Sequence, residues 1–132
     1  MSIVIDEQAW KRFAAKMPSL EAQNVLRQLI DYVTHRLRPK IEQVKTLEDS
    51  IAFFTKGREF LTINIARKGL RIYIHPPAGA FFSSQDKYEV EKVSLWKTSV
   101  DKTSGKYRAI TVWVSRESHL AGIKEIIDRI PV

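Results

Sequence analysis

The chain has 132 residues, of which 44% are hydrophobic and 28% charged, with a formal net charge of +7. This length is enough for one globular domain whose core needs neither disulfides nor a metal ion. The absence of cysteine excludes disulfide scaffolds, thiolate zinc sites and cysteine nucleophiles, and favours a cytoplasmic protein. No apolar run is long enough for a signal peptide or a membrane span, so no membrane partner is expected.

Two amphipathic helices are predicted at the start of the chain. Asp6 is the expected N-cap of a short helix that ends near Lys16, with Trp10 and Phe13 on its apolar side. Ser19 is the expected N-cap of a longer helix over residues 20–38. Its apolar residues recur at helical spacing, which is typical of a side packed against a core.

Strands are predicted over the central part of the chain. Residues 50–55 form one strand, and a turn at 56–59 leads into a hairpin over 60–75. The hairpin turns at residues 67–69, where Gly69 can adopt the positive φ that a tight turn needs. Residues 89–97 and 107–114 alternate in the same way, with a polar connection at 98–106, and 41–45 is a short extended segment. Ser118 is the expected N-cap of a last helix.

The hairpin alternates between an aliphatic face and a mixed face. The aliphatic face carries Leu61, Ile63, Ile65, Leu70, Ile72 and Ile74. The mixed face, called the outer face below, carries Phe60, Thr62, Asn64, Arg71, Tyr73 and His75. This pattern predicts an α+β domain with a four- or five-stranded, mainly antiparallel sheet and the long N-terminal and C-terminal helices on one face.

The predicted core joins this sheet to the two helices. Its expected members are Leu61, Ile63, Ile72, Ile110 and Val112, packed around Leu29 and Ile126. The sequence leaves two possibilities for the outer face. It is exposed to solvent, or Trp10 and Phe13 of the first helix cover it and form a second small core with it.

The positive charge is concentrated in the predicted sheet. Residues 51–115 hold 11 Lys and Arg against 5 Asp and Glu, whereas residues 1–50 hold 8 against 7 and residues 116–132 hold 3 against 3. A basic field on one layer favours a polyanionic partner such as nucleic acid. The alternative is a solvated basic surface that keeps the domain in solution.

The outer face combines rings with cations, which is the chemistry that binds single-stranded nucleic acid. Aromatic rings stack on bases, and cations in turns contact phosphates without regard to sequence. The expected binding residues are Lys56, Arg58, Arg67, Lys68, Arg71, Tyr73, His75, Trp96, Lys97, Arg108 and Trp113. The alternative is a protein–protein or dimerisation interface on the same face.

No enzymatic motif supports catalysis, so no catalytic residue, metal or cofactor is predicted. The chain lacks Gly-rich phosphate loops and the Gly-x-Ser-x-Gly elbow, and its three histidines lack metal-ligand spacing. A metal-dependent nuclease is the remaining alternative, with Asp86, Glu89 and Glu91 around a cation and Lys92 beside them.

Three stretches resemble a known bacterial family. Residues 51–54 (IAFF), 58–60 (REF) and 68–74 (KGLRIYI) resemble domain-of-unknown-function family 5655, and the likeness extends over residues 19–130. The resemblance implies an accessory module beside nuclease or restriction-type domains, with a role in DNA defence; members are also labelled predicted transport proteins. The helix at 6–16 lies outside the family core. A Gly-His-like stretch of the family is absent near Trp96 and Lys97, so a family pocket using that histidine is not expected here.

Overall fold

The computed structural model describes residues 5–17, 19–67, 69–74, 96–100 and 107–128, with the backbone alone for 96–100 and 107–111. The elements in chain order are α1 (Glu7–Lys16), α2 (Leu20–Leu37), the 3-10 turn η1 (Arg38–Lys40), β1 (Gln43–Thr46), β2 (Ser50–Thr55), β3 (Arg58–Ala66), β4 (Gly69–Ile74), β5 (Trp96–Val100), β6 (Tyr107–Val114), the 3-10 turn η2 (Glu117–His119) and α4 (Leu120–Asp128). None of the described helices is both long and apolar enough to cross a bilayer.

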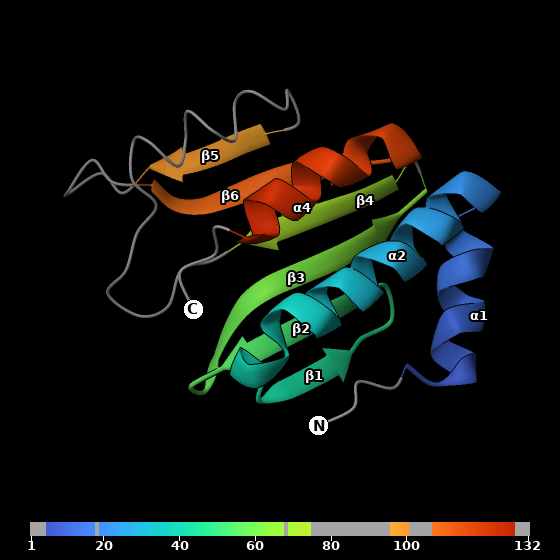
Figure 1. The fold of residues 1–132 in the computed structure, drawn as a ribbon. Helices are drawn as coiled ribbons and strands as arrows, with labels where there is room; N and C mark the ends of the chain where they lie inside the picture. The colour runs from blue at the N-terminus through green and yellow to red at the C-terminus, as the bar shows by residue number, and fades with distance from the viewer. Residues whose placement is uncertain (1–4, 18, 68, 75–95, 101–106, 129–132) are drawn as a thin grey trace.

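The strands form one antiparallel sheet in the order β1-β2-β3-β4-β6-β5. Helices α2 and α4 lie side by side over one face of it (Figure 1). The predicted α+β class, and the long N-terminal and C-terminal helices on one face, are therefore confirmed. The sheet has six strands rather than the predicted four or five, because the short segment 43–46 pairs with β2 as an edge strand.

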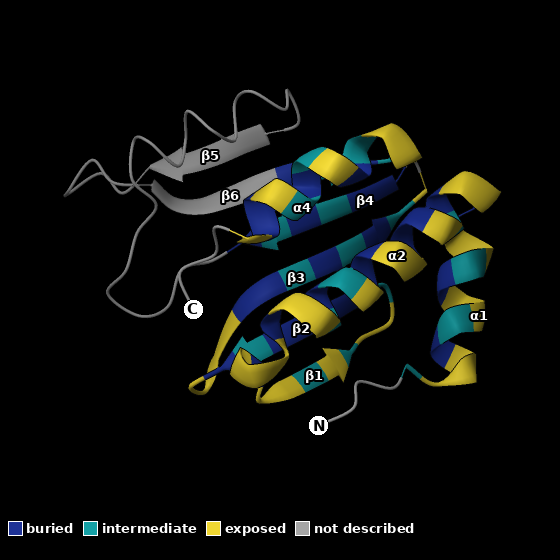
Figure 2. Cartoon of the chain, viewed as in Figure 1, coloured by how far each residue is buried: buried dark blue, intermediate teal, exposed yellow. Residues whose placement is uncertain are grey.

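The central hairpin has the predicted register. Ile63 pairs with Ile72, and Ala66 pairs with Gly69 across the turn. All six aliphatic side chains of this face have no exposed area, and they share one core with Leu29 and Ile126. Figure 2 shows buried and half-buried residues alternating along β3 and β4. Val112 of β6 joins the same core, whereas the side chain of Ile110 lies outside the described part.

Phe60 does not lie on the outer face, and this part of the prediction is wrong. The pairing shifts between Phe53, which lies opposite Leu61, and Phe54, which lies opposite Glu59. Phe60 is therefore the extra residue of a β-bulge, where strict alternation fails. Phe60 and Leu61 are consecutive residues, and both are buried in the core.

The predicted caps hold at the first two helices. Asp6 Oδ1 accepts a hydrogen bond from the backbone N–H of Ala9 at 2.7 Å. Ser19 Oγ accepts one from the backbone N–H of Ala22 at 3.3 Å. Each cap satisfies a backbone donor that has no partner within its helix.

Ser118 does not cap the last helix, because it lies inside η2. The His119 side chain instead takes part in the cap of η2: its Nδ1 accepts from the backbone N–H of Ser115 at 3.1 Å and of Arg116, the N-cap residue of η2, at 3.3 Å. The ring folds back onto the end of β6, and α4 begins at Leu120.

The strand predicted over 89–97 has different bounds. β5 begins at Trp96 and continues to Val100, so residues 98–100 belong to a strand rather than to a polar connection. They pair with β6, which supplies the backbone partners that the alternation of a single segment does not reveal. Residues 89–95 lie outside the described part.

Helix α1 does not cover the outer face, so the alternative in which Trp10 and Phe13 roof it is wrong. Phe13 is buried in the same core as the aliphatic sheet face, and Trp10 packs against that core. The Arg27 guanidinium of α2 lies 4.3 Å from the centre of the Trp10 ring, which places α1 beside α2 (Figure 1). The described helices all contribute to one side of the sheet.

Gly69 and Gly57 both adopt positive φ, but only Gly69 is closely packed. An added Cβ at Gly69 (φ +148°) would lie 2.8 Å from Ser115 Cβ and 2.9 Å from the Val114 carbonyl oxygen. At Gly57 (φ +73°) it would meet no atom within 4 Å.

We expect Gly69→Ala to lower the free energy of unfolding by roughly 2–4 kcal/mol, against about 1 kcal/mol for Gly57→Ala. Urea denaturation measures both, and equal losses would contradict this packing of the turn against β6.

Candidate functional site

The outer face presents two rows of side chains across neighbouring strands. The first row runs from Ser50 through Asn64 and Arg71 to Trp113 on strands β2, β3, β4 and β6. The second row contains Ala52, Thr62 and Tyr73. Asn64, Thr62, Arg71, Tyr73 and Trp113 are half-buried, and no described helix covers them.

Arg71 is the centre of this surface. Its guanidinium carbon lies 4.5 Å from the centre of the Trp113 ring, and its Nη1 donates to the Tyr73 hydroxyl at 3.0 Å. A cation over an indole ring at an exposed site contributes about 0.5–1 kcal/mol. The two contacts hold the planar guanidinium in one orientation, so the cation and the two rings act as one group. We call Arg71, Tyr73 and Trp113 the arginine cluster.

The structure separates the predicted turn cations into two groups. Arg67 follows the end of β3 and is exposed near the arginine cluster, whereas Lys56 and Arg58 are exposed at the start of β3. β3 has nine residues, and at about 3.3 Å per residue its ends lie roughly 30 Å apart. These cations therefore do not form one patch around the arginine cluster.

Acidic groups accompany the distant pair of cations. Glu42 Oε1 accepts from the backbone N–H of Gly57 at 3.3 Å, and the exposed Glu59 follows Arg58 in β3. The first row of the outer face, by contrast, contains Arg71 and no acidic residue. At the end of the sheet that carries Arg67, the acidic residues of the β1–β2 turn lie beside cations of α1, where Lys16 forms an ion pair with Asp49. Arg67 is therefore the predicted turn cation that lies nearest to the first row.

The register assigns the predicted residues of β5 and β6 to different faces. Lys97 pairs with Thr111, which pairs with Tyr73, so its position belongs to the second row of the outer face. Trp96 pairs with Val112, which pairs with the core residue Ile72, so its position alternates to the helix-covered face. Arg108 occupies the register shift of β6. The side chains of these three predicted residues, and all of Lys68 and His75, lie outside the described part.

A second cation–ring pair lies on the sheet and was not predicted from the sequence. Lys45 of β1 places its Nζ 5.1 Å from the centre of the Phe54 ring on β2. Lys45 pairs with Ala52, two residues before Phe54, so the contact is diagonal. The sequence alternates in both 43–46 and 50–55, but it does not show that these two segments pair. The contact between Lys45 and Phe54 follows only from the pairing of β1 with β2.

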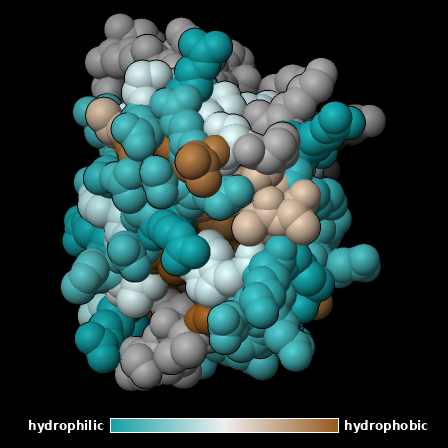
Figure 3. All heavy atoms as spheres, turned by 90° about the vertical axis from the view of Figure 1, so that its right-hand side faces the viewer, coloured by the Kyte–Doolittle hydropathy of each residue, from teal (hydrophilic) through white to brown (hydrophobic). Residues whose placement is uncertain are grey.

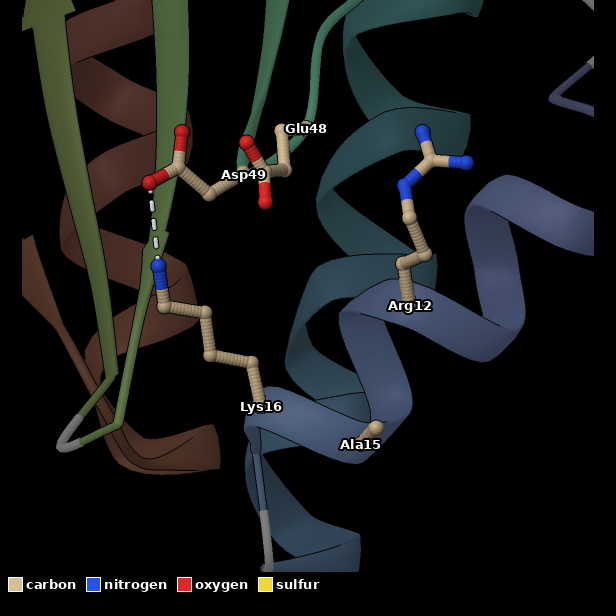
Figure 4. Close-up of a pocket in the computed structure, with 5 residues that line it drawn as sticks. All are labelled: Arg12, Ala15, Lys16, Glu48 and Asp49. Carbon is tan, nitrogen blue, oxygen red and sulfur yellow. Dashed lines mark hydrogen bonds and ion pairs between the residues drawn. The ribbon is translucent and has the colours of Figure 1, made fainter.

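A groove of about 450 Å³ separates α1 from the turn between β1 and β2 (Figure 4). Lys16 Nζ forms an ion pair with Asp49 Oδ2 at 2.9 Å, and Arg12 donates to the Leu47 carbonyl oxygen at 3.3 Å. Glu48 completes a lining whose charges balance. These contacts attach α1 to the turn. Because exposed ion pairs contribute only about 0–1 kcal/mol, the attachment adds little to the stability of the fold. The surrounding surface is largely hydrophilic with scattered hydrophobic residues (Figure 3).

A polar network joins α2 to α4 on the other side of the molecule. The Tyr32 hydroxyl donates to Asp128 Oδ1 at 2.6 Å, and Arg36 Nε contacts the same oxygen at 2.9 Å. Lys124 Nζ lies 5.2 Å from the centre of the Tyr32 ring. The hydrogen bond to Asp128, reinforced by desolvation, raises the pKa of Tyr32 above its ordinary value. The network therefore connects the two helices that cover the sheet.

The described residues contain no candidate metal site. Among the described residues, no three His, Asp or Glu side chains are grouped so that they could hold an ion. Asp86, Glu89, Glu91 and Lys92, the residues of the nuclease alternative, lie outside these residues. The alternative is therefore untested.

No protein-family model, curated protein or solved structure matches this chain. The resemblance to family 5655 and the accessory role that it implies remain predictions.

The Tyr32 hydrogen bond predicts a pH dependence of stability. An unfolded tyrosine has its ordinary pKa of 10.0, and the folded value is higher. The folded state thus retains the proton longer, so the stabilisation is complete below about pH 10 and is lost as the pH rises through the folded pKa. Between about pH 8 and pH 11, we expect the free energy of unfolding from urea denaturation to fall less in Tyr32→Phe than in the wild type. Equal falls would show that the hydrogen bond to Asp128 does not form in solution.

Proposed function

We propose that this domain is a non-catalytic module that binds nucleic acid through the outer face of its sheet. The arginine cluster offers stacking surfaces for bases, and Arg67 at the adjacent turn supplies a phosphate contact. Single strands bind such surfaces because every base has a planar face and every nucleotide a negative charge. An accessory role in bacterial DNA defence, in the cytoplasm, is the part of the proposal that rests on the family resemblance.

The observation that carries the proposal is the state of Arg71. A long cationic side chain on a sheet surface ordinarily extends into water, and immobilising it costs side-chain entropy. Here it is held against Trp113 and hydrogen-bonded to Tyr73. Guanidinium planes and aromatic rings are the groups on which unpaired bases stack. Preorganising such a group lowers the entropy lost when a ligand binds.

The net charge and its position support the same partner. The chain carries +7, and residues 51–115 hold most of this excess. A protein–protein or dimerisation interface on the same face is the second candidate, because half-buried Tyr and Trp beside Arg are typical of interface centres. Ionic strength distinguishes the two, since nucleic-acid affinity falls steeply with salt as counterions are released.

The paired variants Arg67→Glu and Arg58→Glu test the position of the site. Both reverse one exposed arginine and change the net charge equally, at opposite ends of β3. In titrations of a labelled single-stranded oligonucleotide at several salt concentrations, we expect Arg67→Glu to weaken binding and reduce the salt slope by about one unit. Arg58→Glu should retain most of the affinity and the full slope.

Two outcomes would contradict the proposal. Equal weakening by both variants would indicate general attraction to a basic protein rather than a site near Arg67. A wild-type dissociation constant below about one micromolar at low salt that does not rise as the salt concentration is raised would favour an interface without phosphate contacts.

A further inference from the structure

We propose that the first row of the outer face recognises adenine, with Asn64 as the residue that determines specificity. This inference rests on the proposed function and names the base that the same surface prefers. A base would stack on the face of the Arg71 guanidinium that points away from Trp113, with its edge against the Asn64 amide.

The order of the strands places Asn64, Arg71 and Trp113 side by side across the sheet. Asn64 on β3 pairs with Arg71 on β4, and Arg71 pairs with Trp113 on β6. Arg71 thus stands between the ring and the amide. Trp113 lies on the β6 side of Arg71, with its ring centre 4.5 Å from the guanidinium carbon, and Asn64 lies on the β3 side. A planar ligand stacked there would lie above Asn64.

Asn64 has hydrogen-bonding capacity that the described fold does not use. Its side chain is half-buried, and it forms no hydrogen bond with any described residue. The amide offers one carbonyl acceptor and an NH₂ donor. Asparagine is also a poor strand former, so packing alone does not favour it at the centre of a sheet. A ligand that pairs with the amide would satisfy a group that is partly removed from water.

Adenine is the base whose chemistry fits this pair of groups. An asparagine amide makes two hydrogen bonds to adenine, accepting from N6 and donating to N7. Guanine presents two acceptors at the same edge, which suits a guanidinium better than an amide. Thymine and cytosine have no N7. The neighbouring residue on β2 is Ser50, whose side chain is short and buried.

The test replaces a single atom of the ligand. A deoxyadenosine oligonucleotide of about ten nucleotides is compared with its 7-deaza-adenine counterpart, which stacks similarly but lacks the N7 acceptor. We expect the wild type to bind the adenine strand about tenfold more tightly. In Asn64→Leu, which keeps the size of the side chain, the two affinities should become equal. Thr62→Val, on the same face of β3, should retain the difference.

The outcomes separate this inference from the proposed function. If the wild type binds both strands with equal affinity, the adenine inference is wrong and the proposed function stands. If neither strand binds at low salt, the proposed function itself is wrong. Circular dichroism checks that Asn64→Leu is folded, and Asn64→Val, which suits a strand and has no hydrogen-bond donor, replaces it if it is not.

Discussion

The burial of one aliphatic sheet face under α2 and α4 is the constraint on which the rest of the structure depends. Ile63 and Ile72 meet across the central hairpin with no exposed area, and a slip of one residue would turn both to the opposite face. Such a slip would move a residue with a side chain into the position of Gly69. The end of β6 lies too close to this position to leave room for a side chain, so the slip is disfavoured. The register of the hairpin in turn orients Arg71 and Tyr73 away from the core.

The commitment of the helices to one side determines what the outer face can do. α1 adds Phe13 to the same core instead of covering the opposite surface. The outer face therefore keeps polar and aromatic groups, and cross-strand pairing assembles them in order. Arg71 donates a hydrogen bond to Tyr73 on its own strand and places its guanidinium over the Trp113 ring of the next strand. The sheet thus supplies a rigid base for side chains that are individually flexible, which is the arrangement that favours binding.

Local patterns predicted much of the fold and part of the site. The caps at Asp6 and Ser19 and the two faces of the hairpin depend on residues near in sequence, and they were predictable. The bulge at Phe60 depends on the pairing with β2, and the cap at His119 on a ring that folds back to β6, so neither follows from periodicity. Arg71, Tyr73 and Trp113 were expected on one face; their mutual contacts required the order of β4 and β6. The distance between Lys56 and Arg67 was implicit in the length of β3.

The most direct test follows the arginine cluster and the helix side at the same time. Trp113 and Trp10 lie on opposite sides of the sheet. Their indole N–H signals in two-dimensional NMR spectra can be assigned by substituting each residue in turn. On titration with a single-stranded oligonucleotide, the signal of Trp113 should shift together with the backbone signals of Arg71 and Tyr73, while that of Trp10 stays in place. Shifts at Trp10 and α2, with an unchanged signal from Trp113, would contradict the assignment of binding to the outer face.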